Sequence, residues 1–286
     1  MPLKQESQNK AFGGTLTKYS FASKSLGGLE TKFNVFMPAE GEKSKVPVLY
    51  YLAGLTCTED TGPQKSHLLA PAAQHGIAIV FPDTSPRGAK IEGEDADWDF
   101  GTGAGFYLNA SSEKWSGHYN MEKFVVEELR GIVQSELSVD SERTSIFGHS
   151  MGGHGALSLY LKYPGQYKSA SGFAPICNPT ECQWGQKAFK GYLSDPSSEG
   201  PKHDSTYLIA SYPKDKKVAI KVDYGTGDKF YQDGQLLPEN FEKAVRDAGR
   251  QGEVEVGRRE GYDHSYFFIS TFAAEHVEFH AKYLKA

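Results

Sequence analysis

The sequence predicts an α/β fold in which a mostly parallel central sheet carries helices on both faces. Two observations predict it. Short apolar runs rich in β-branched and aromatic residues recur along the chain, and stretches with helical periodicity lie between them. Strands that alternate with helices usually form a parallel sheet, because each parallel pair needs a crossover connection and a helix supplies it.

Each predicted strand is a short apolar run bounded by turn residues. The clearest run is VPVLYYL at 46–52, whose near-continuous apolar character is typical of a strand covered on both faces. The other predicted strands are 33–37, 77–81, 144–148, 169–174, 218–223 and 253–258.

The predicted helices separate these strands. Residues 121–136 form the clearest amphipathic pattern, because Phe124, Val125, Leu129 and Val133 recur at helical spacing. Further helices are expected at 66–74, 152–163, 238–248 and 271–284.

Two long segments fit no regular element and are expected to shape a pocket. Residues 82–119 predict an ordered loop over one end of the sheet, because disordered segments are poor in aromatic residues. Its acidic run from Glu92 to Asp99 is expected to be solvated; a metal site is the alternative, although the spacing matches no EF-hand. Residues 175–212 predict an irregular excursion. No linker divides the chain, so residues 1–286 are predicted to form a single domain.

Composition excludes several classes of protein. The net charge of −5 argues against nucleic acid as a partner, since phosphate binding needs clustered Lys and Arg. Cys57, Cys177 and Cys182 are an odd number without CxxC spacing, which disfavours a disulfide framework and structural zinc and fits a reducing compartment. We see no signal-peptide pattern and no apolar run of membrane-spanning length, so we expect a cytoplasmic protein without membrane contact.

The segment SIFGHSMGGHGA at 145–156 contains the motif G-x-S-x-G directly between a predicted strand and a predicted helix. This setting is typical of the nucleophile elbow of the α/β-hydrolase fold, where a strained turn projects the serine hydroxyl. Gly148 and Gly152 flank the turn, where a Cβ would meet neighbouring backbone. We therefore predict an α/β-hydrolase fold with Ser150 as the nucleophile. The alternative is a glycine-rich turn in which Ser150 only caps the helix.

A serine nucleophile needs a histidine base, which in this fold comes after the serine in the chain. His264 is the predicted base, because it lies in a glycine-containing loop between the last strand and the last helix. His154 lies one turn into the helix that follows the serine and reaches back poorly. His276 and His280 form an HxxxH pair that permits a weak metal interpretation and otherwise indicates surface or core residues.

The acid that orients the base is expected just after the strand at 218–223. Asp228, in the loop that follows this strand, is preferred. Asp223 ends the strand and is the nearest competitor, while Asp233 comes late. Asp263 neighbours the base in sequence, and adjacent loop side chains tend to diverge.

Two backbone N–H groups are expected to bind the oxyanion. One belongs to Met151, directly after the nucleophile, and the other to Leu55, in the loop after the strand at 46–52. Cys57 would then lie near the active site. Nothing in the sequence places a base beside Cys57, so it is not expected to be the nucleophile, and a small buried apolar residue is the alternative interpretation.

Beyond these residues, the chain resembles the S-formylglutathione hydrolase family, also called esterase D, nearly from end to end. Four stretches in order carry the resemblance: LAGLTCTE at 52–59, GHSMGGHGAL at 148–157, DGQLLPENF at 233–241 and EGYDHSYFF at 260–268.

The resemblance implies hydrolysis of the thioester S-formylglutathione to formate and glutathione in formaldehyde detoxification. It also implies a cytoplasmic homodimer that needs no metal or organic cofactor and accepts short acyl esters as side substrates. Carried over by position, the family's triad falls on Ser150, Asp228 and His264, its oxyanion donors on Leu55 and Met151, and a family cysteine on Cys57.

Other functions remain open at the level of sequence. A general short-chain carboxylesterase and an acyltransferase similar to the mycolyltransferases would share this fold. A catalytically inactive hydrolase fold that binds partners is opposed by the complete set of Ser150, Asp228 and His264. Arg87, Lys65 and Lys187 are candidates for the glutathione carboxylates only because of their positions in predicted loops.

Overall fold

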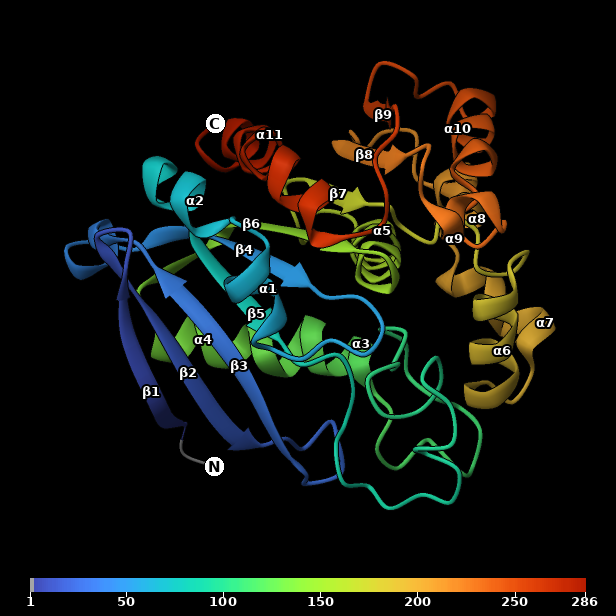
Figure 1. Ribbon diagram of the computed structural model, residues 1–286, viewed down its shortest axis with the longest axis horizontal. Coiled ribbons are helices and arrows are strands. Elements are labelled where there is room, and N and C mark those ends of the chain that lie inside the picture. Colours follow the sequence, from blue (N-terminus) through green and yellow to red (C-terminus); the bar gives the residue numbers. More distant parts are fainter. Residues whose placement is uncertain (1–2) are drawn as a thin grey trace.

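The computed structural model describes residues 3–286 and contains a nine-stranded sheet (Figure 1). The strands lie in the order β1-β2-β3-β5-β4-β6-β7-β8-β9. The six strands from β5 to β9 pair in parallel, and helices cover both faces of the sheet, which confirms the predicted fold class. These strands are β4 (Val46–Leu52), β5 (Ala78–Pro82), β6 (Val139–His149), β7 (Ala170–Phe173), β8 (Ile220–Gly225) and β9 (Val254–Arg259).

The antiparallel edge of the sheet includes two strands that the sequence did not predict. β1 (Lys4–Ala11) pairs with β2 (Gly14–Ala22), and β2 pairs with β3 (Glu30–Met37), which continues antiparallel to β5. Seven of the eight residues of β1 are exposed, so this strand buries no apolar face that periodicity could reveal. Its charged and polar side chains are typical of an edge strand that resists further pairing.

Helices cover the sheet in two layers (Figure 1). On one face, α11 (Tyr266–Leu284) packs against α2 (Leu69–His75) and against β6, β7 and β8. On the other lie α5 (Met151–Lys162) and a continuous helical stretch over 121–136, which consists of α3 (Met121–Lys123), a π-helical segment (Phe124–Leu129) and α4 (Arg130–Glu136). Other helices are α1 (Thr61–Lys65), α9 (Lys229–Gln232) and α10 (Pro238–Asp247), and a 3-10 turn lies at Ala39–Glu42.

The expectation that 175–212 is irregular is wrong. This segment forms α6 (Gln183–Tyr192), α7 (Pro196–Glu199), a 3-10 turn (Gly200–His203) and α8 (Ser205–Ser211). The side chains of Asp195 and Asp204 accept backbone N–H groups at the N-termini of α7 and α8. Short capped helices escape detection by periodicity, because seven residues or fewer span barely two turns.

The HxxxH pair on α11 is a core feature. His276 and His280 are fully buried, and the Ser171 hydroxyl of β7 lies 2.8 Å from a ring nitrogen of each. The second nitrogen of His276 lies 2.9 Å from the Asp223 carboxylate, and that of His280 lies 2.8 Å from the Ser169 hydroxyl. Burial opposes the ionised form of Asp223, but its contacts with His276 and Arg259 outweigh this and lower its pKa. This chain of hydrogen bonds fastens α11 to the sheet.

Within residues 3–286, no helix is both long enough and apolar enough to cross a membrane.

Buried histidines predict that the protein loses stability in mild acid. Burial lowers the pKa of His154 to about 4 and that of His280 well below its usual value. Because the unfolded chain takes up these protons from about pH 6.5 downward, the stability they support is complete above that pH and declines below it. Each such group contributes up to ~1.4 kcal/mol per pH unit. Urea unfolding at pH 7.0 and 5.5 measures the expected drop in midpoint.

Two variants test the origin of this pH dependence. The substitution His280→Gln removes a buried titrating group and should flatten the dependence. The substitution His67→Asn changes an exposed histidine and should leave the dependence unchanged. A wild-type midpoint that is the same at both pH values would contradict the assignment.

Candidate active site

Ser150 lies at the junction between β6 and α5, in a backbone conformation that few residues adopt. Its φ of 58° and ψ of −120° lie outside the regions that residues with a Cβ prefer. Such strain persists only where the surrounding structure enforces it, and it is typical of functional sites. The turn has the strained geometry expected of a nucleophile elbow at the G-x-S-x-G motif, and it lies at the carboxyl edge of the parallel strands.

Close backbone contacts enforce this turn. Leu52 of β4 pairs in register with Gly148 of β6, which brings the end of β4 against the start of α5. A Cβ on Gly152 would lie 2.0 Å from the carbonyl oxygen of Leu52, and one on Gly148 would lie 2.3 Å from the carbonyl oxygen of Gly152. Both positions therefore exclude any side chain.

The structure brings His264 and Asp228 together. Nδ1 of His264 lies 2.5 Å from Oδ2 of Asp228, and the Asp228 side chain is completely buried. The other carboxylate oxygen accepts the backbone N–H groups of Phe230 and Tyr231 and caps α9. One oxygen is thus fixed by the helix and the other faces the imidazole. In this geometry Nδ1–H donates to the carboxylate and Nε2 is left to act as an acceptor.

The competing acids have other partners. Asp223 contacts His276 and forms an ion pair with Arg259, with a nitrogen–oxygen distance of 3.0 Å. Asp263 accepts the backbone N–H and the hydroxyl of Ser265, at the start of α11. The sequence could rank these carboxylates only by their distance from the strand end, whereas the structure places Asp228 against His264.

The loop after β4 passes directly beside Ser150. A Cβ on Gly54 would lie 3.1 Å from the Cβ of Ser150, and Leu55 lines the same cavity as the serine. Met151 is the first residue of α5, where backbone N–H groups have no partner within the helix. The N–H of Met151 and the positive end of the helix dipole therefore favour a negative charge at this point.

Side chains from the long loop hold the loop after β4 in place. The carbonyl oxygen of Cys57 accepts hydrogen bonds from the Thr84 hydroxyl at 2.6 Å and from Nη2 of Arg87 at 3.1 Å. Arg87 is fixed in turn by two contacts of 2.7 Å with the Asp83 carboxylate. Arg87, one of the candidates for a glutathione carboxylate, is therefore already engaged in supporting this loop.

The candidate catalytic residues lie around a cavity of about 200 Å³. Ser150, His264, Leu55 and Cys57 share it, so the structure brings together the residues that the sequence singled out. The part of the wall that comes from distant elements had no signal in the sequence, apart from the aromatic residues in those segments. The complete lining is Gly54, Leu55, Thr56, Cys57, Trp98, His149, Ser150, Trp184, Phe230 and His264.

Two further side chains contact the catalytic candidates. The His149 ring lies with its centroid 4.6 Å from that of His264, and burial, followed by the neighbouring His264, lowers its pKa well below the usual value. A neutral His149 therefore packs against the base. Burial raises the pKa of the Cys57 thiol, whose sulfur lies 3.9 Å from the Tyr266 hydroxyl. A protonated thiol is a weak nucleophile, which agrees with the role expected for Cys57.

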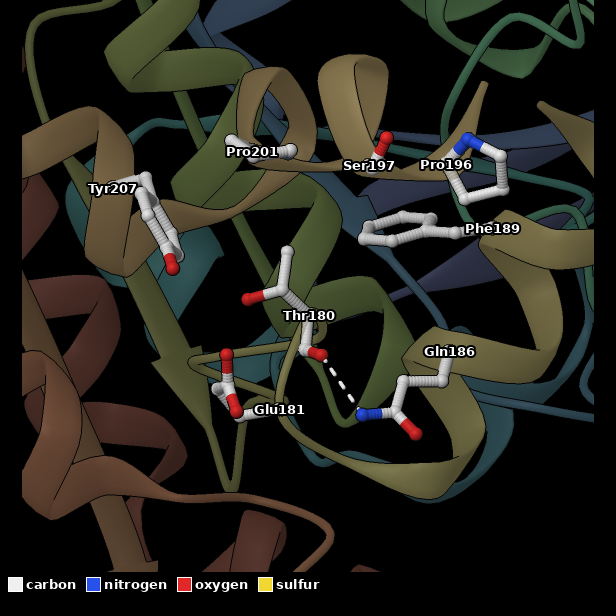
Figure 2. Close-up of a pocket in the computed structure, with 8 residues that line it drawn as sticks. All are labelled: Thr180, Glu181, Gln186, Phe189, Pro196, Ser197, Pro201 and Tyr207. Carbon is white, nitrogen blue, oxygen red and sulfur yellow. Dashed lines mark hydrogen bonds between the residues drawn. The ribbon is translucent and has the colours of Figure 1, made fainter. Parts of the chain in front are cut away.

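A larger cavity lies away from these residues. Its volume is about 310 Å³. Figure 2 shows Phe189, Pro201 and Tyr207 among the residues that line it, and Nε2 of Gln186, which donates to the carbonyl oxygen of Thr180. None of the catalytic candidates lines this cavity. This cavity is therefore separate from the candidate active site, which the strained Ser150 and its neighbours mark.

The sequence suggested that the acidic side chains of the long loop are solvated, but three of them are paired or buried. Asp97 and Asp99 both pair with Lys187 of α6, the first at 2.9 Å, and Glu94 is buried. Lys187 is therefore also engaged and is not a free cation for a substrate carboxylate. Across residues 3–286, no three His, Cys, Asp or Glu side chains are grouped so that they could hold a metal ion.

Known proteins share both the fold and the sequence pattern. The model of the Esterase family matches residues 23–279. A solved structure of an S-formylglutathione hydrolase from Agrobacterium tumefaciens superimposes with a TM-score of 0.90 at 38% identity, covering 98% of this chain and 99% of that one. Fold, site and family match together define a serine esterase of the α/β-hydrolase type.

Curated relatives narrow the class. The S-formylglutathione hydrolase of Bos taurus is 49% identical over the full length of both chains. That of Arabidopsis thaliana is 45% identical over 99% of this chain and 98% of its own. The chain belongs to the S-formylglutathione hydrolase family.

The substitution Gly152→Ala is expected to damage the elbow. Its Cβ would collide with the Leu52 carbonyl, and overpacking of this kind costs about 1–3 kcal/mol. We expect a lower urea midpoint together with at least tenfold slower ester hydrolysis, because the turn that presents Ser150 must shift.

The matched control is Gly131→Ala in α4, where no atom beyond the neighbouring backbone of the same helix lies within 4 Å of the added Cβ. Alanine there should leave hydrolysis unchanged and raise the midpoint slightly, since it has the higher helix propensity. Equal behaviour of the two variants would contradict the steric account.

Proposed function

We propose that this chain hydrolyses S-formylglutathione to formate and glutathione, the hydrolytic step of formaldehyde detoxification. The observation that carries the proposal is full-length identity of 45–49% with curated S-formylglutathione hydrolases. The paired His264 and Asp228 beside a strained serine support it, because a thioesterase of this family needs an activated serine.

In the first half of the reaction, Ser150 attacks the formyl carbonyl while Nε2 of His264 takes the hydroxyl proton. The carbon–oxygen double bond opens to an oxyanion that the N–H groups of Leu55 and Met151 bind, and each such donor contributes about 3 kcal/mol in comparable sites. When the tetrahedral intermediate collapses, the carbon–sulfur bond breaks. His264 then gives its proton to the departing glutathione thiolate.

In the second half, water replaces glutathione. His264 takes a proton from the water as it attacks the formyl ester of Ser150, and the same two N–H groups bind the second oxyanion. Collapse releases formate and returns the proton to Ser150. Asp228 stays ionised throughout and stabilises the imidazolium each time it forms.

The small aromatic cavity favours this substrate over those of the rival activities. About 200 Å³ holds a formyl or acetyl thioester end, but it is below the range of about 300–1,000 Å³ typical of sites that enclose a whole drug-sized ligand. A general carboxylesterase or a transferase of long acyl chains would need more room near the serine. The bulk of glutathione then extends beyond the cavity.

Membership of this family supports a proposal for the cellular setting. We propose a cytoplasmic homodimer whose residues 1–286 act as a single catalytic domain. Three free cysteines, two of them buried, agree with a reducing compartment. Light scattering on the purified protein measures the oligomeric state, and a monomer at micromolar concentration would contradict the dimer.

The substrate assignment predicts a thioester preference that depends on Ser150. We expect kcat/KM for S-formylglutathione to exceed that for p-nitrophenyl acetate by at least about 100-fold, a difference of about 2.7 kcal/mol between the transition states. The substitution Ser150→Ala should abolish both activities while circular dichroism remains unchanged. Faster ester turnover than thioester turnover would keep the serine hydrolase and reject the substrate.

The acid assignment predicts opposite effects at two aspartates. The substitution Asp228→Asn keeps the oxygen that caps α9 but loses the charge beside His264, so kcat should fall about 10⁴-fold with little change in stability. The substitution Asp223→Asn should lower the unfolding free energy and leave kcat within about threefold, because Asp223 serves the core network. The reverse pattern would exchange their roles.

A further inference from the structure

Trp98 is an exposed aromatic side chain at the edge of the candidate active site. It lines the cavity that contains Ser150, yet 56% of its surface is open to solvent. Burial holds an indole this exposed less firmly than a core side chain, so specific contacts contribute to its position. One such contact is with Trp184 of α6, whose ring meets Trp98 edge-on at a centroid distance of 5.7 Å.

The aromatic contact continues inward to the base. Trp184 packs against Phe230 at 4.7 Å, and Phe230 meets the His264 ring edge-on at 4.8 Å. Trp98 is therefore the outermost member of a row of rings that ends on His264. Displacement of Trp98 would open this side of the cavity without touching Ser150 or Asp228.

Lys187 anchors the segment that carries Trp98. Its ammonium group pairs with Asp97 and with Asp99, the residues directly before and after the tryptophan. Lys187 lies three positions after Trp184 on α6, so one face of this helix supplies both the aromatic partner and the cation. The two pairs pull the segment 97–99 onto the same helix from both sides of Trp98.

Neighbouring contacts fix the loop on either side of this segment, and an isolated antiparallel bridge joins Asp97 to Phe100 across it. After it, Phe100 stacks on Tyr192 at a centroid distance of 4.4 Å. Before it, Glu94 is buried and accepts the backbone N–H of Ile91. Between these anchor points, the bridge shapes the backbone, and the contacts of Asp97, Trp98 and Asp99 hold the segment against α6.

We propose that Lys187 is a positioning residue that, through Asp97 and Asp99, holds Trp98 against Trp184 as a wall of the cavity and thereby limits the acyl group to one or two carbons. The inference rests on the proposed function, in which the acyl group is formyl. The wall excludes longer chains by volume, because the indole occupies the space into which they would extend. The bond-making steps at Ser150 are unaffected.

The experiment compares p-nitrophenyl acetate, butyrate and hexanoate as substrates of the full-length protein. In wild type we expect kcat/KM to fall steeply with chain length. The substitution Lys187→Gln should reduce the ratio of acetate to hexanoate turnover about fivefold, since partly exposed ion pairs contribute up to about 1 kcal/mol. The double substitution Asp97→Asn with Asp99→Asn should give the same change, and Lys187→Arg should restore the wild-type ratio.

Controls separate positioning from general damage. Lys190→Gln removes an exposed lysine from the same helix and should leave the ratio unchanged. Trp98→Ala removes the wall itself and should lower the ratio at least as far as Lys187→Gln. Wild type in 1 M KCl should shift in the same direction, because salt screens the exposed pairs.

Comparison of Lys187→Gln with Trp98→Ala tests separately whether Lys187 is the anchor and whether Trp98 is the wall. An unchanged ratio in Lys187→Gln beside a lowered ratio in Trp98→Ala would reject Lys187 as the anchor, and an unchanged ratio in both would reject the wall. The ester series does not require S-formylglutathione. If the thioester proved a poor substrate, the proposed function would fail while the chain-length ratio still tested the wall.

Discussion

The close approach of β4 to the start of α5 is the constraint on which the site depends. The Leu52 carbonyl leaves no room for a Cβ on Gly152, and the resulting tight turn forces Ser150 to a φ of 58°. The same approach brings the loop after β4 beside Ser150, so that Gly54 and Leu55 lie next to the serine. One packing contact therefore positions both Ser150, the proposed nucleophile, and one of the groups proposed to bind the oxyanion.

The other candidate residues reach this point from distant parts of the chain, because parallel strands share a carboxyl edge. Asp228 follows β8, and His264 lies between β9 and α11. The buried network of Asp223, His276 and Ser171 fastens α11 to the strands behind the site. The network that stabilises α11 and the proposed catalytic pair thus use different carboxylates and histidines, although these residues are close in sequence.

Much of this arrangement could be predicted from sequence, because its signals are local. The strand at 46–52 and the helix at 121–136 have strong apolar patterns, and the G-x-S-x-G motif marks a turn that only small residues permit. The polar strand β1 has no buried face to reveal it, and the short helices between 183 and 211 depend on caps and tertiary contacts. The pairing of Lys187 with Asp97 and Asp99 joins positions about 90 residues apart, and no local pattern encodes such a contact.

The two carboxylate oxygens of Asp228 have different partners, since one caps α9 and the other accepts a hydrogen bond from His264. The carboxylate cannot rotate to follow the imidazole without uncapping the helix. The direction of the acceptor, and with it the tautomer of the base, is therefore set during folding, before any substrate arrives. If Asp228 is the acid, as proposed, it needs no reorganisation within the catalytic cycle.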